Sequence, residues 1–156
     1  MIRMTRLTDY GIMLLTLFAR DEKHPMKSAR DLSEQAKLPL PTVSKILKLL
    51  ARHGLLEAHR GVRGGFTLSR KPDRITMAEV IGALEGPIGM TDCCAPPSDC
   101  GIEKSCIVKN NWMKINRVVL EALDRITLAE MTHPIQLNST PVEWKNKGRL
   151  AAAQKG

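Results

Sequence analysis

Apolar residues recur at helical spacing in the first third of the chain and predict a series of short helices. Thr5 precedes a wide apolar face and is placed to cap a first helix that extends to about Ala19. Ser28 and Asp31 form a capping-box pattern at the start of a short second helix. The width of the first apolar face indicates that this helix contacts both its own core and a partner.

A third helix is predicted over residues 41–53, and its apolar and polar positions separate sharply. Apolar residues fall on one face, and Gly54 follows as a C-terminal cap. The opposite face is polar and basic. The residues expected to point inward are Val43, Ile46, Leu47 and Leu50. The polar residues of this helix are Thr42, Ser44, Lys45, Lys48 and Arg52.

Two short apolar runs follow, Leu55 to His59 and Phe66 to Leu68, and they predict a β-hairpin. The tip between them is rich in glycine and carries Arg60 and Arg63. Helix, turn, helix and hairpin is the element order of a winged helix-turn-helix domain. The predicted fold is therefore mainly α with a small β-hairpin.

The second half of the chain predicts two more helices with a loop between them. One begins at Thr76, with Glu79 completing a capping box, and stops at Gly86. Residues 88–105 are expected to be loop, and a long helix is predicted over about residues 106–128. Its apolar seam requires a facing helix, which we expect to be a second copy of the chain. The seam residues are Val108, Trp112, Ile115, Val119, Leu123 and Ile126.

These patterns divide the chain into four parts. Residues 1–86 are predicted to be the winged-helix domain, residues 87–105 a cysteine loop, and residues 106–131 a dimerisation helix. Residues 132–156 contain proline, glycine and lysine without stable periodicity, which is typical of a flexible basic tail.

Composition favours a globular protein with an anionic partner. Of the 156 residues, 43% are hydrophobic and 26% charged, and 24 basic residues outnumber 16 acidic ones, giving a net charge of +8. Such a balance suits nucleic acid or a membrane surface. The apolar run from Gly11 to Ala19 is too short to span a bilayer, so we expect a cytoplasmic protein with no membrane partner.

The third predicted helix and the hairpin are suited to double-stranded DNA. In a helix-turn-helix the second helix enters the major groove, where Thr42, Ser44, Lys45 and Lys48 would face base edges and Arg52 a phosphate. Arg60 and Arg63 suit the minor groove or flanking phosphates. A basic helix face can also be merely solvated, but the adjoining basic hairpin favours DNA.

Four cysteines lie close together, which predicts metal binding or redox sensing. Cytosolic thiols stay reduced, so a structural disulfide is not expected. Cys94, Cys100 and Cys106 are separated by five residues each, a wider spacing than in zinc-ribbon pairs. Soft thiolates select zinc or iron-sulfur centres, and spacing alone leaves both open. Cys106 is expected at a helix start, where free backbone amides favour its thiolate.

The order of these motifs resembles the Rrf2 family of iron-sulfur transcription regulators. The resemblance covers about residues 1–131 and rests on the hairpin 60–66, the helix 76–84, the three cysteines and residues 126–128. Residues 7–11 and the cysteine spacing are most similar to the branch that regulates Suf iron-sulfur assembly genes, followed by the nitric-oxide-sensing repressors. The resemblance implies a homodimeric repressor, and an iron-sulfur cluster rather than zinc.

The resemblance also bears on the fourth cluster ligand. Members that regulate Isc genes have a histidine three residues after the third cysteine, but here that residue is Lys109, which cannot bind while charged. In the nitric-oxide-sensing branch a carboxylate on the partner's first helix completes the site, and Asp9 matches it. Asp9 could equally be a surface carboxylate paired with Arg6, and Cys93 a spare thiol or a replacement ligand.

The hypothesis from sequence is therefore that a cluster of two or four irons, held by Cys94, Cys100, Cys106 and Asp9, sets the angle between two DNA-binding heads. A nitric-oxide sensor and a cluster-free thiol switch, in which two of the cysteines form a disulfide, are the alternatives. An enzyme is not expected, because the sequence has no catalytic triad pattern, phosphate loop or paired catalytic carboxylates.

Overall fold

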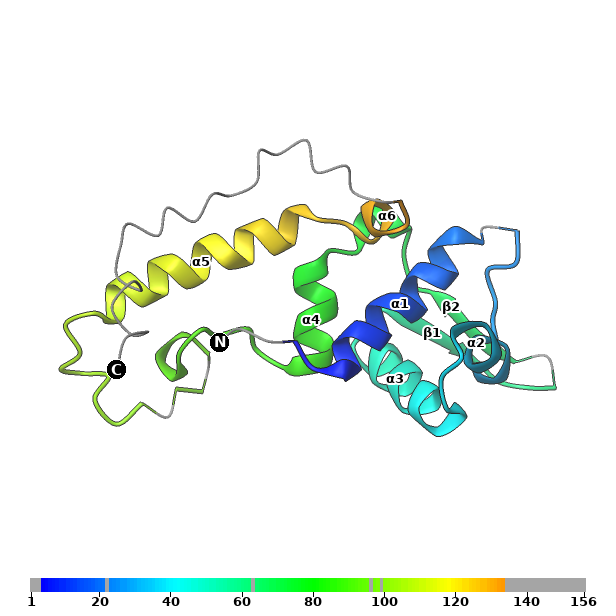
Figure 1. Ribbon diagram of the computed structural model, residues 1–156, viewed down its shortest axis with the longest axis horizontal. Helices are drawn as coiled ribbons and strands as arrows, with labels where there is room; N and C mark the ends of the chain where they lie inside the picture. The colour runs from blue at the N-terminus through cyan, green and yellow to red at the C-terminus, as the bar shows by residue number, and fades with distance from the viewer. Residues whose placement is uncertain (1–3, 22, 63, 96, 99, 134–156) are drawn as a thin grey trace, which may run out of the picture.

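The computed structural model describes residues 4–21, 23–62, 64–95, 97–98 and 100–133. The molecule is elongated: a head of short helices and one hairpin lies at one end, and a long helix leads away from it to the cysteine loop (Figure 1). The elements are α1 (Arg6–Arg20), α2 (Ala29–Ala36), α3 (Leu40–Arg52), β1 (Leu56–His59), β2 (Gly65–Leu68), η1 (Pro72–Arg74), α4 (Met77–Glu85), η2 (Asp92–Cys94), α5 (Lys109–Arg125) and α6 (Leu128–Met131).

Side-chain caps start the helices where the sequence predicts them. Thr5 caps α1, with its hydroxyl accepting a hydrogen bond from the amide of Thr8 at 3.4 Å. Ser28 opens α2 with a complete capping box, and Thr76 does the same for α4. Gly54, with a φ of +72°, follows α3 in the left-handed conformation that a helix end favours. The predicted starts of these three helices are confirmed.

The core of the head lies between α1, α3 and α4. The four inward residues predicted on α3 are all fully buried, and each contributes about 1.5–3 kcal/mol by leaving water. α1 approaches α4 closely because Gly11 has no side chain: a Cβ there would lie 2.4 Å from a methyl carbon of Leu84. The mainly α architecture with one antiparallel hairpin, predicted from sequence, is confirmed.

The hairpin is tied to the rest of the head by one buried lysine. Strands β1 and β2 pair antiparallel, with Leu56 opposite Leu68. Lys27, just before α2, exchanges two backbone hydrogen bonds of 3.0 and 2.9 Å with Phe66 of β2. Its ammonium bonds Asp21 at 2.8 Å and, with the amide of His24, lowers the pKa of that carboxyl to about 2. The hairpin is thereby attached to the end of α1.

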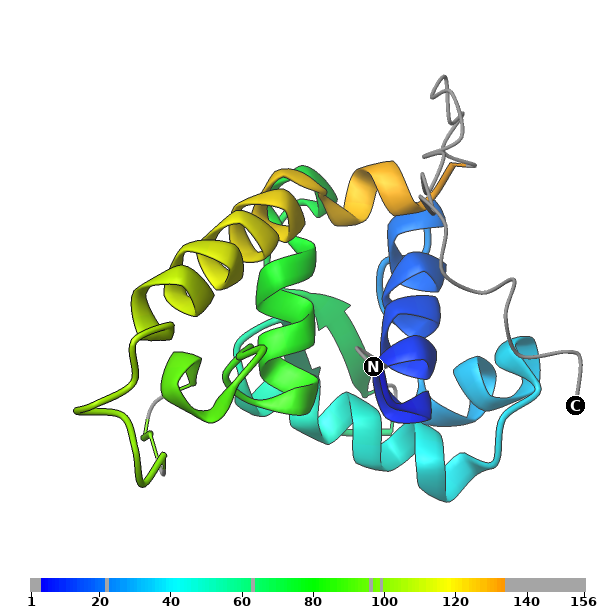
Figure 2. The ribbon, with the colours of Figure 1, turned by 60° about the vertical axis from the view of Figure 1, so that its left-hand side comes forward.

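The long helix is shorter at its C-terminal end than the periodicity predicts. α5 ends at Arg125, because Ile126 and Thr127 adopt extended backbone and Thr127 forms an antiparallel bridge with Thr76. Met77 donates to the carbonyl of Ile126 at 2.9 Å. Thr127 then caps α6, which returns toward the end of α1 (Figure 2). The apolar spacing of the sequence continues from α5 through Ile126, so it could not show that the helix stops before this bridge.

At its other end α5 begins at Lys109, and the prediction that Cys106 starts the helix is wrong. The carbonyl of Cys106 accepts a hydrogen bond from the Lys109 amide at 3.3 Å, so Cys106 lies in the turn before the helix. The expectation for its thiolate had assumed a place at the helix start, which Cys106 does not have. Within the described residues, no helix is long and apolar enough to cross a membrane. The predicted tail lies outside the described residues from 134 onward.

Candidate DNA interface and cysteine loop

The outward face of α3 presents three cations. Lys45, Lys48 and Arg52 are exposed and follow one another at spacings of three and four residues, so they share one side of the helix. Thr42 and Ser44 are half-buried beside them. Within the described part of the chain, no carboxylate forms an ion pair with any of the three cations. Their charges are therefore available to a polyanion.

The hairpin tip is a tight turn that depends on glycine. Gly61 has a φ of +116°, and the amide of Gly64 donates to its carbonyl at 2.9 Å. A Cβ at Gly64 would lie 2.3 Å from the carbonyl oxygen of His59. Arg60 is exposed at this tip, whereas Arg63 lies outside the described residues. The turn projects one predicted DNA contact from the head.

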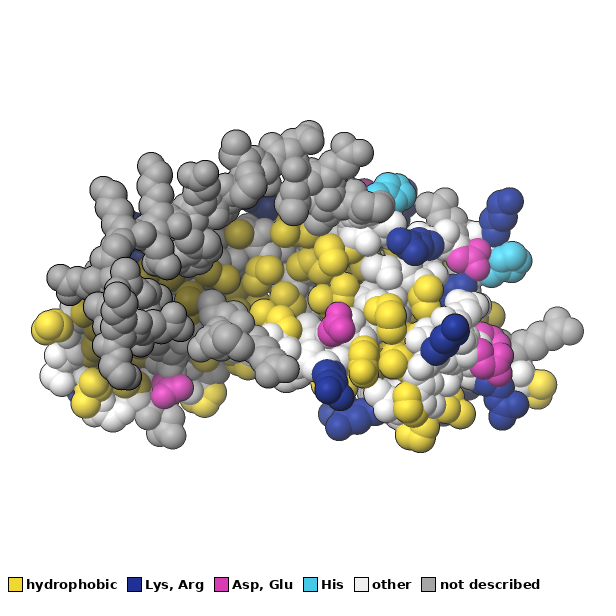
Figure 3. Space-filling model, viewed as in Figure 1, with side chains coloured by type: hydrophobic (Ala, Val, Ile, Leu, Met, Phe, Trp, Pro, Cys, Tyr) yellow, Lys and Arg dark blue, Asp and Glu magenta, His cyan; other side chains and the backbone are white. Residues whose placement is uncertain are grey.

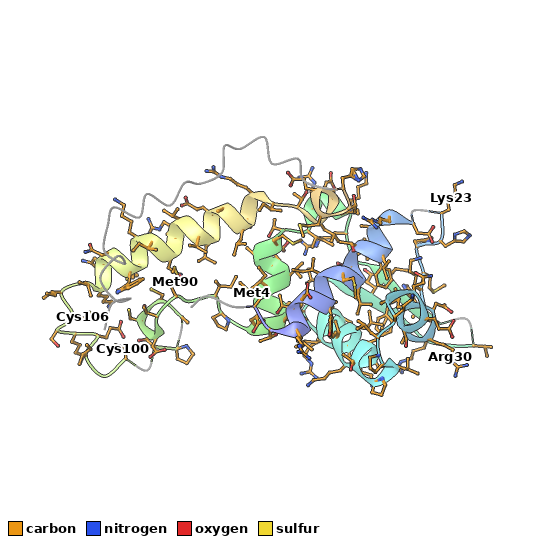
Figure 4. The ribbon with its side chains drawn as sticks, viewed as in Figure 1. Met4, Lys23, Arg30, Met90, Cys100 and Cys106 are labelled. Carbon is orange, nitrogen blue, oxygen red and sulfur yellow. The ribbon has the colours of Figure 1, made fainter. Side chains whose placement is uncertain are left out.

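The cysteine loop lies at the opposite end of the molecule from the hairpin (Figure 4). Its first arm, residues 88–95, is held against α5 by Asn116. The Asn116 amide oxygen accepts a hydrogen bond from the Met90 amide at 3.0 Å, and its nitrogen donates to the carbonyl of Ile88 at 3.3 Å. Thr91 then contacts the sulfurs of Cys93 and Cys94 at 3.2 and 3.3 Å. This arm is fixed by a helix.

The second arm, residues 97–98 and 100–108, carries Cys100 and Cys106 and is held mostly by its own turns. Glu103 donates its amide to the Cys100 carbonyl at 3.1 Å, and its carboxylate bonds Lys109 at 2.7 Å. The hydrogen bond from Lys109 lowers the pKa of Glu103 and raises the pKa of the lysine. Lys109 is thus a charged partner of Glu103, consistent with its exclusion as a ligand.

The thiols fit an iron-sulfur group in their chemistry but are not gathered around one point. All four cysteines are free and half-buried. Among the described residues, no three histidine, cysteine, aspartate or glutamate side chains are grouped closely enough to hold a metal ion. Cys94 instead lines a small cavity of about 190 Å³ against α5, together with Asn116. Soft thiolates are the donors that iron-sulfur centres use.

Asp9 lies in the first turn of α1 with an exposed side chain. The ion pair of Asp9 with Arg6 that the sequence left open is not formed in the described part of the chain. Its neighbour Thr8 is buried and donates its hydroxyl to Glu85 at the end of α4. That bond lowers the pKa of Glu85. Asp9 is therefore left facing outward from a firmly held turn.

The predicted apolar seam of α5 separates into two parts. Trp112 and Ile115 are 37% and 45% exposed, and Val118 beside them is 59% exposed. Leu123 and Ile126 instead pack against the core of their own chain. Figure 3 shows hydrophobic side chains gathered on the side formed by α4 and α5. Among the described residues, the N-terminal part of the seam is therefore the part that is exposed to another helix.

Two residues important to this arrangement were missed at the sequence level. Asn116 is 6% exposed on a helix with no other buried residue, and Lys27 is buried under the hairpin. A polar residue among the apolar positions of the seam was a visible sign for Asn116. The attachment of Lys27 to the hairpin had no local sign, because Phe66, which its backbone bonds, is distant in sequence.

Residues 4–134 match a family model described as Rrf2, iron-dependent transcriptional regulator. The chain is 27% identical over 130 residues to a helix-turn-helix transcriptional regulator of Synechocystis sp., covering 83% of this chain and 87% of that protein. It is 24% identical over 131 residues to the transcriptional regulator NsrR of Shouchella clausii, covering 83% and 88%. These relatives are transcription regulators, not enzymes.

Solved structures show the same architecture. CymR, the global cysteine regulator of B. subtilis, matches with a TM-score of 0.66 and 26% identity over 85% of this chain and 97% of that chain. T. potens IscR matches with a TM-score of 0.60 and 26% identity over 83% and 85%. The winged-helix fold predicted from the element order is confirmed.

Proposed function

The chain belongs to the Rrf2 family of iron-dependent transcriptional regulators, and we propose that it is a homodimeric repressor that senses iron-sulfur cluster status in the cytoplasm. The proposed targets are promoters of Suf iron-sulfur assembly genes, as the resemblance of residues 7–11 and of the cysteine spacing implies. The observation that carries the proposal is the loop of four free, half-buried thiols, whose first arm is attached to the same helix that presents an exposed apolar face.

DNA binding is assigned to α3 and the hairpin. Lys45 and Lys48 would reach base edges or phosphates in the major groove, with Thr42 and Ser44 adding hydroxyl contacts. Arg52 would bind a phosphate. Arg60 and Arg63 would contact the minor groove or its flanking phosphates. The support is the exposed row of cations on α3, which form no ion pair within the described residues, next to a projecting basic turn.

Dimerisation is assigned to the exposed part of the α5 seam. Trp112, Ile115 and Val118 present apolar surface on one stretch of helix, which soluble proteins usually cover. A second copy of α5 would cover it and bring two heads onto two half-sites. Because both heads must match a set half-site spacing, a small change in their relative angle would cost specific DNA affinity.

Cys94, Cys100 and Cys106 would hold the cluster, with Asp9 of the partner subunit as fourth ligand and Cys93 as the alternative. When bound, the cluster supplies a group that reacts with oxygen or nitric oxide and responds to iron supply. Asp9 lies on the same helix as the buried Thr8, so a bond from Asp9 to the other subunit would connect that subunit's loop to α1. The nitric-oxide sensor is the second candidate, favoured by the outward carboxylate of Asp9.

The test is anaerobic purification with iron and sulfide quantification, for the wild type, Cys94→Ser, Cys93→Ser and Asp9→Ala, followed by promoter binding with and without cluster. We expect a coloured wild type, loss of the cluster in Cys94→Ser, and a cluster of altered spectrum in Asp9→Ala. If Cys93→Ser loses the cluster and Asp9→Ala does not, the fourth ligand is Cys93. A wild type that stays colourless after anaerobic reconstitution would refute the cluster and favour the thiol switch.

A further inference from the structure

The two arms of the cysteine loop are held very differently. The first arm is bonded at two backbone positions to α5, and Ile88 at its start packs against the core. Gly89 and Ala95 also meet closely, since a Cβ on Gly89 would lie 2.6 Å from that of Ala95. In the described part of the second arm, the only side-chain bond to a helix is that between Glu103 and Lys109.

Asn116 is the side chain that produces this difference. A polar side chain is costly to bury unless its hydrogen bonds are made. Asn116 is 6% exposed, and both ends of its amide bond the backbone of residues 88–90. It also lines the small cavity beside Cys94. A leucine of similar volume could not bond the Met90 amide or the Ile88 carbonyl, so the amide side chain is explained by the loop it binds.

We propose that Asn116 is a positioning residue that places the arm carrying Cys94 before any metal binds, so that only the arm with Cys100 and Cys106 must close to complete the site. The proposal rests on the proposed function for the identity of the bound group. That Asn116 places the arm carrying Cys94 is a claim about the cluster-free protein and does not depend on the bound group. Supporting side chains of this kind commonly change metal affinity by about ten- to a hundredfold.

The experiment compares Asn116→Ala and Asn116→Leu with Asn111→Ala, which removes an exposed asparagine from the same helix. Asn116→Leu retains the side-chain volume while removing both hydrogen bonds. In the cluster-free protein, hydrogen exchange at the Met90 amide should be about tenfold faster in both Asn116 variants and unchanged in Asn111→Ala. Protection of α3 and α4 should stay at the wild-type level, which shows that the variants fold.

The second measurement is made after anaerobic reconstitution. Both Asn116 variants should lose iron to a chelator about tenfold faster than the wild type, and the visible circular dichroism of the cluster should change. Unchanged exchange at Met90 would overturn the proposal, and so would faster exchange with wild-type iron retention and spectrum. If the wild type takes up neither iron nor sulfide, the proposed function fails, and the exchange data alone decide whether Asn116 positions the arm.

Discussion

The head, which consists of α1 to α4 and the hairpin, is stabilised differently from α5. In the head, α1, α3 and α4 bury leucine, isoleucine and valine side chains completely, and most of its helices begin with a hydroxyl cap. α5 is the longest helix, yet it has no side-chain cap and its single buried residue is Asn116. The side chains of the head therefore stabilise one another. In contrast, the apolar surface of α5 needs a partner, and its buried Asn116 needs the backbone of the cysteine loop.

This contrast is consistent with a division of labour in the proposed regulator. A DNA-reading surface must keep one shape, which a dense core provides. A sensing arm must respond to a ligand, and segments with few buried contacts have low local stability. Asn116 lies where the two requirements meet, because it fixes the first arm of the loop to the middle of α5, whereas the second arm has a side-chain bond only to Lys109 at the start of the helix among the described residues.

The largest effect is expected from a cavity in the head. Leu47→Ala should lower the free energy of unfolding by about 2–5 kcal/mol, because Leu47 is fully buried between helices. Ile107→Ala, at a position 95% exposed before α5, should change it by less than about 0.5 kcal/mol. Urea unfolding of both variants at one protein concentration measures the difference. Equal losses would remove the contrast between the head and α5.

The next effect concerns self-association through the exposed apolar part of α5. Ile115→Glu places a charge in the exposed apolar part of the seam and should weaken self-association about a hundredfold or more, since an interface cannot bury an unpaired carboxylate cheaply. Sedimentation velocity over a concentration series measures this. Val62→Glu at the fully exposed hairpin tip is the control and should associate normally. A dimer that survives Ile115→Glu would place the interface elsewhere.

A smaller effect is expected on DNA affinity from the outward face of α3, which is the proposed DNA interface. Lys48→Gln should reduce the slope of log affinity against log salt by about 1, because one phosphate neutralisation is lost. Lys23→Gln, which removes an exposed charge beyond the end of α1, should leave the slope as it is. Fluorescence anisotropy with promoter DNA between low and moderate salt measures both. Identical slopes for the two variants would move the interface away from α3.

The smallest effect is on acid stability. The Lys27 ammonium lowers the pKa of Asp21 from 3.8 to about 2, so the carboxylate adds stability above its ordinary pKa. That contribution should be lost as the pH falls from about 4 to about 2, and Asp21→Asn should lack this part of the acid transition. Urea midpoints across this pH range measure it, with Asp73→Asn as an exposed control. Parallel wild-type and Asp21→Asn curves would contradict the assignment.

Local chemistry determined much of the fold in advance. Thr5, Ser28 and Thr76 marked helix starts because a hydroxyl that bonds a free amide acts within one turn. The alternation of apolar and polar positions on α3 identified its buried face, since the helical period alone decides which side chains share a side. The exposed basic face of α3 followed from the same period. The cysteine spacing and basic hairpin suggested a family that the comparisons then showed.

Contacts between distant segments were decided only by the tertiary structure. The bridge between Thr127 and Thr76 ended α5 early, the bonds of Asn116 to residues 88–90 attached the first arm of the cysteine loop, and Lys27 secured the hairpin. In each case a side chain or strand meets a partner that no local spacing specifies. By itself, therefore, the sequence determined the periodic helices and their caps. The placement of the cysteine loop relative to α5 required the packed chain, because hydrogen bonds between remote residues depend on where the whole backbone goes.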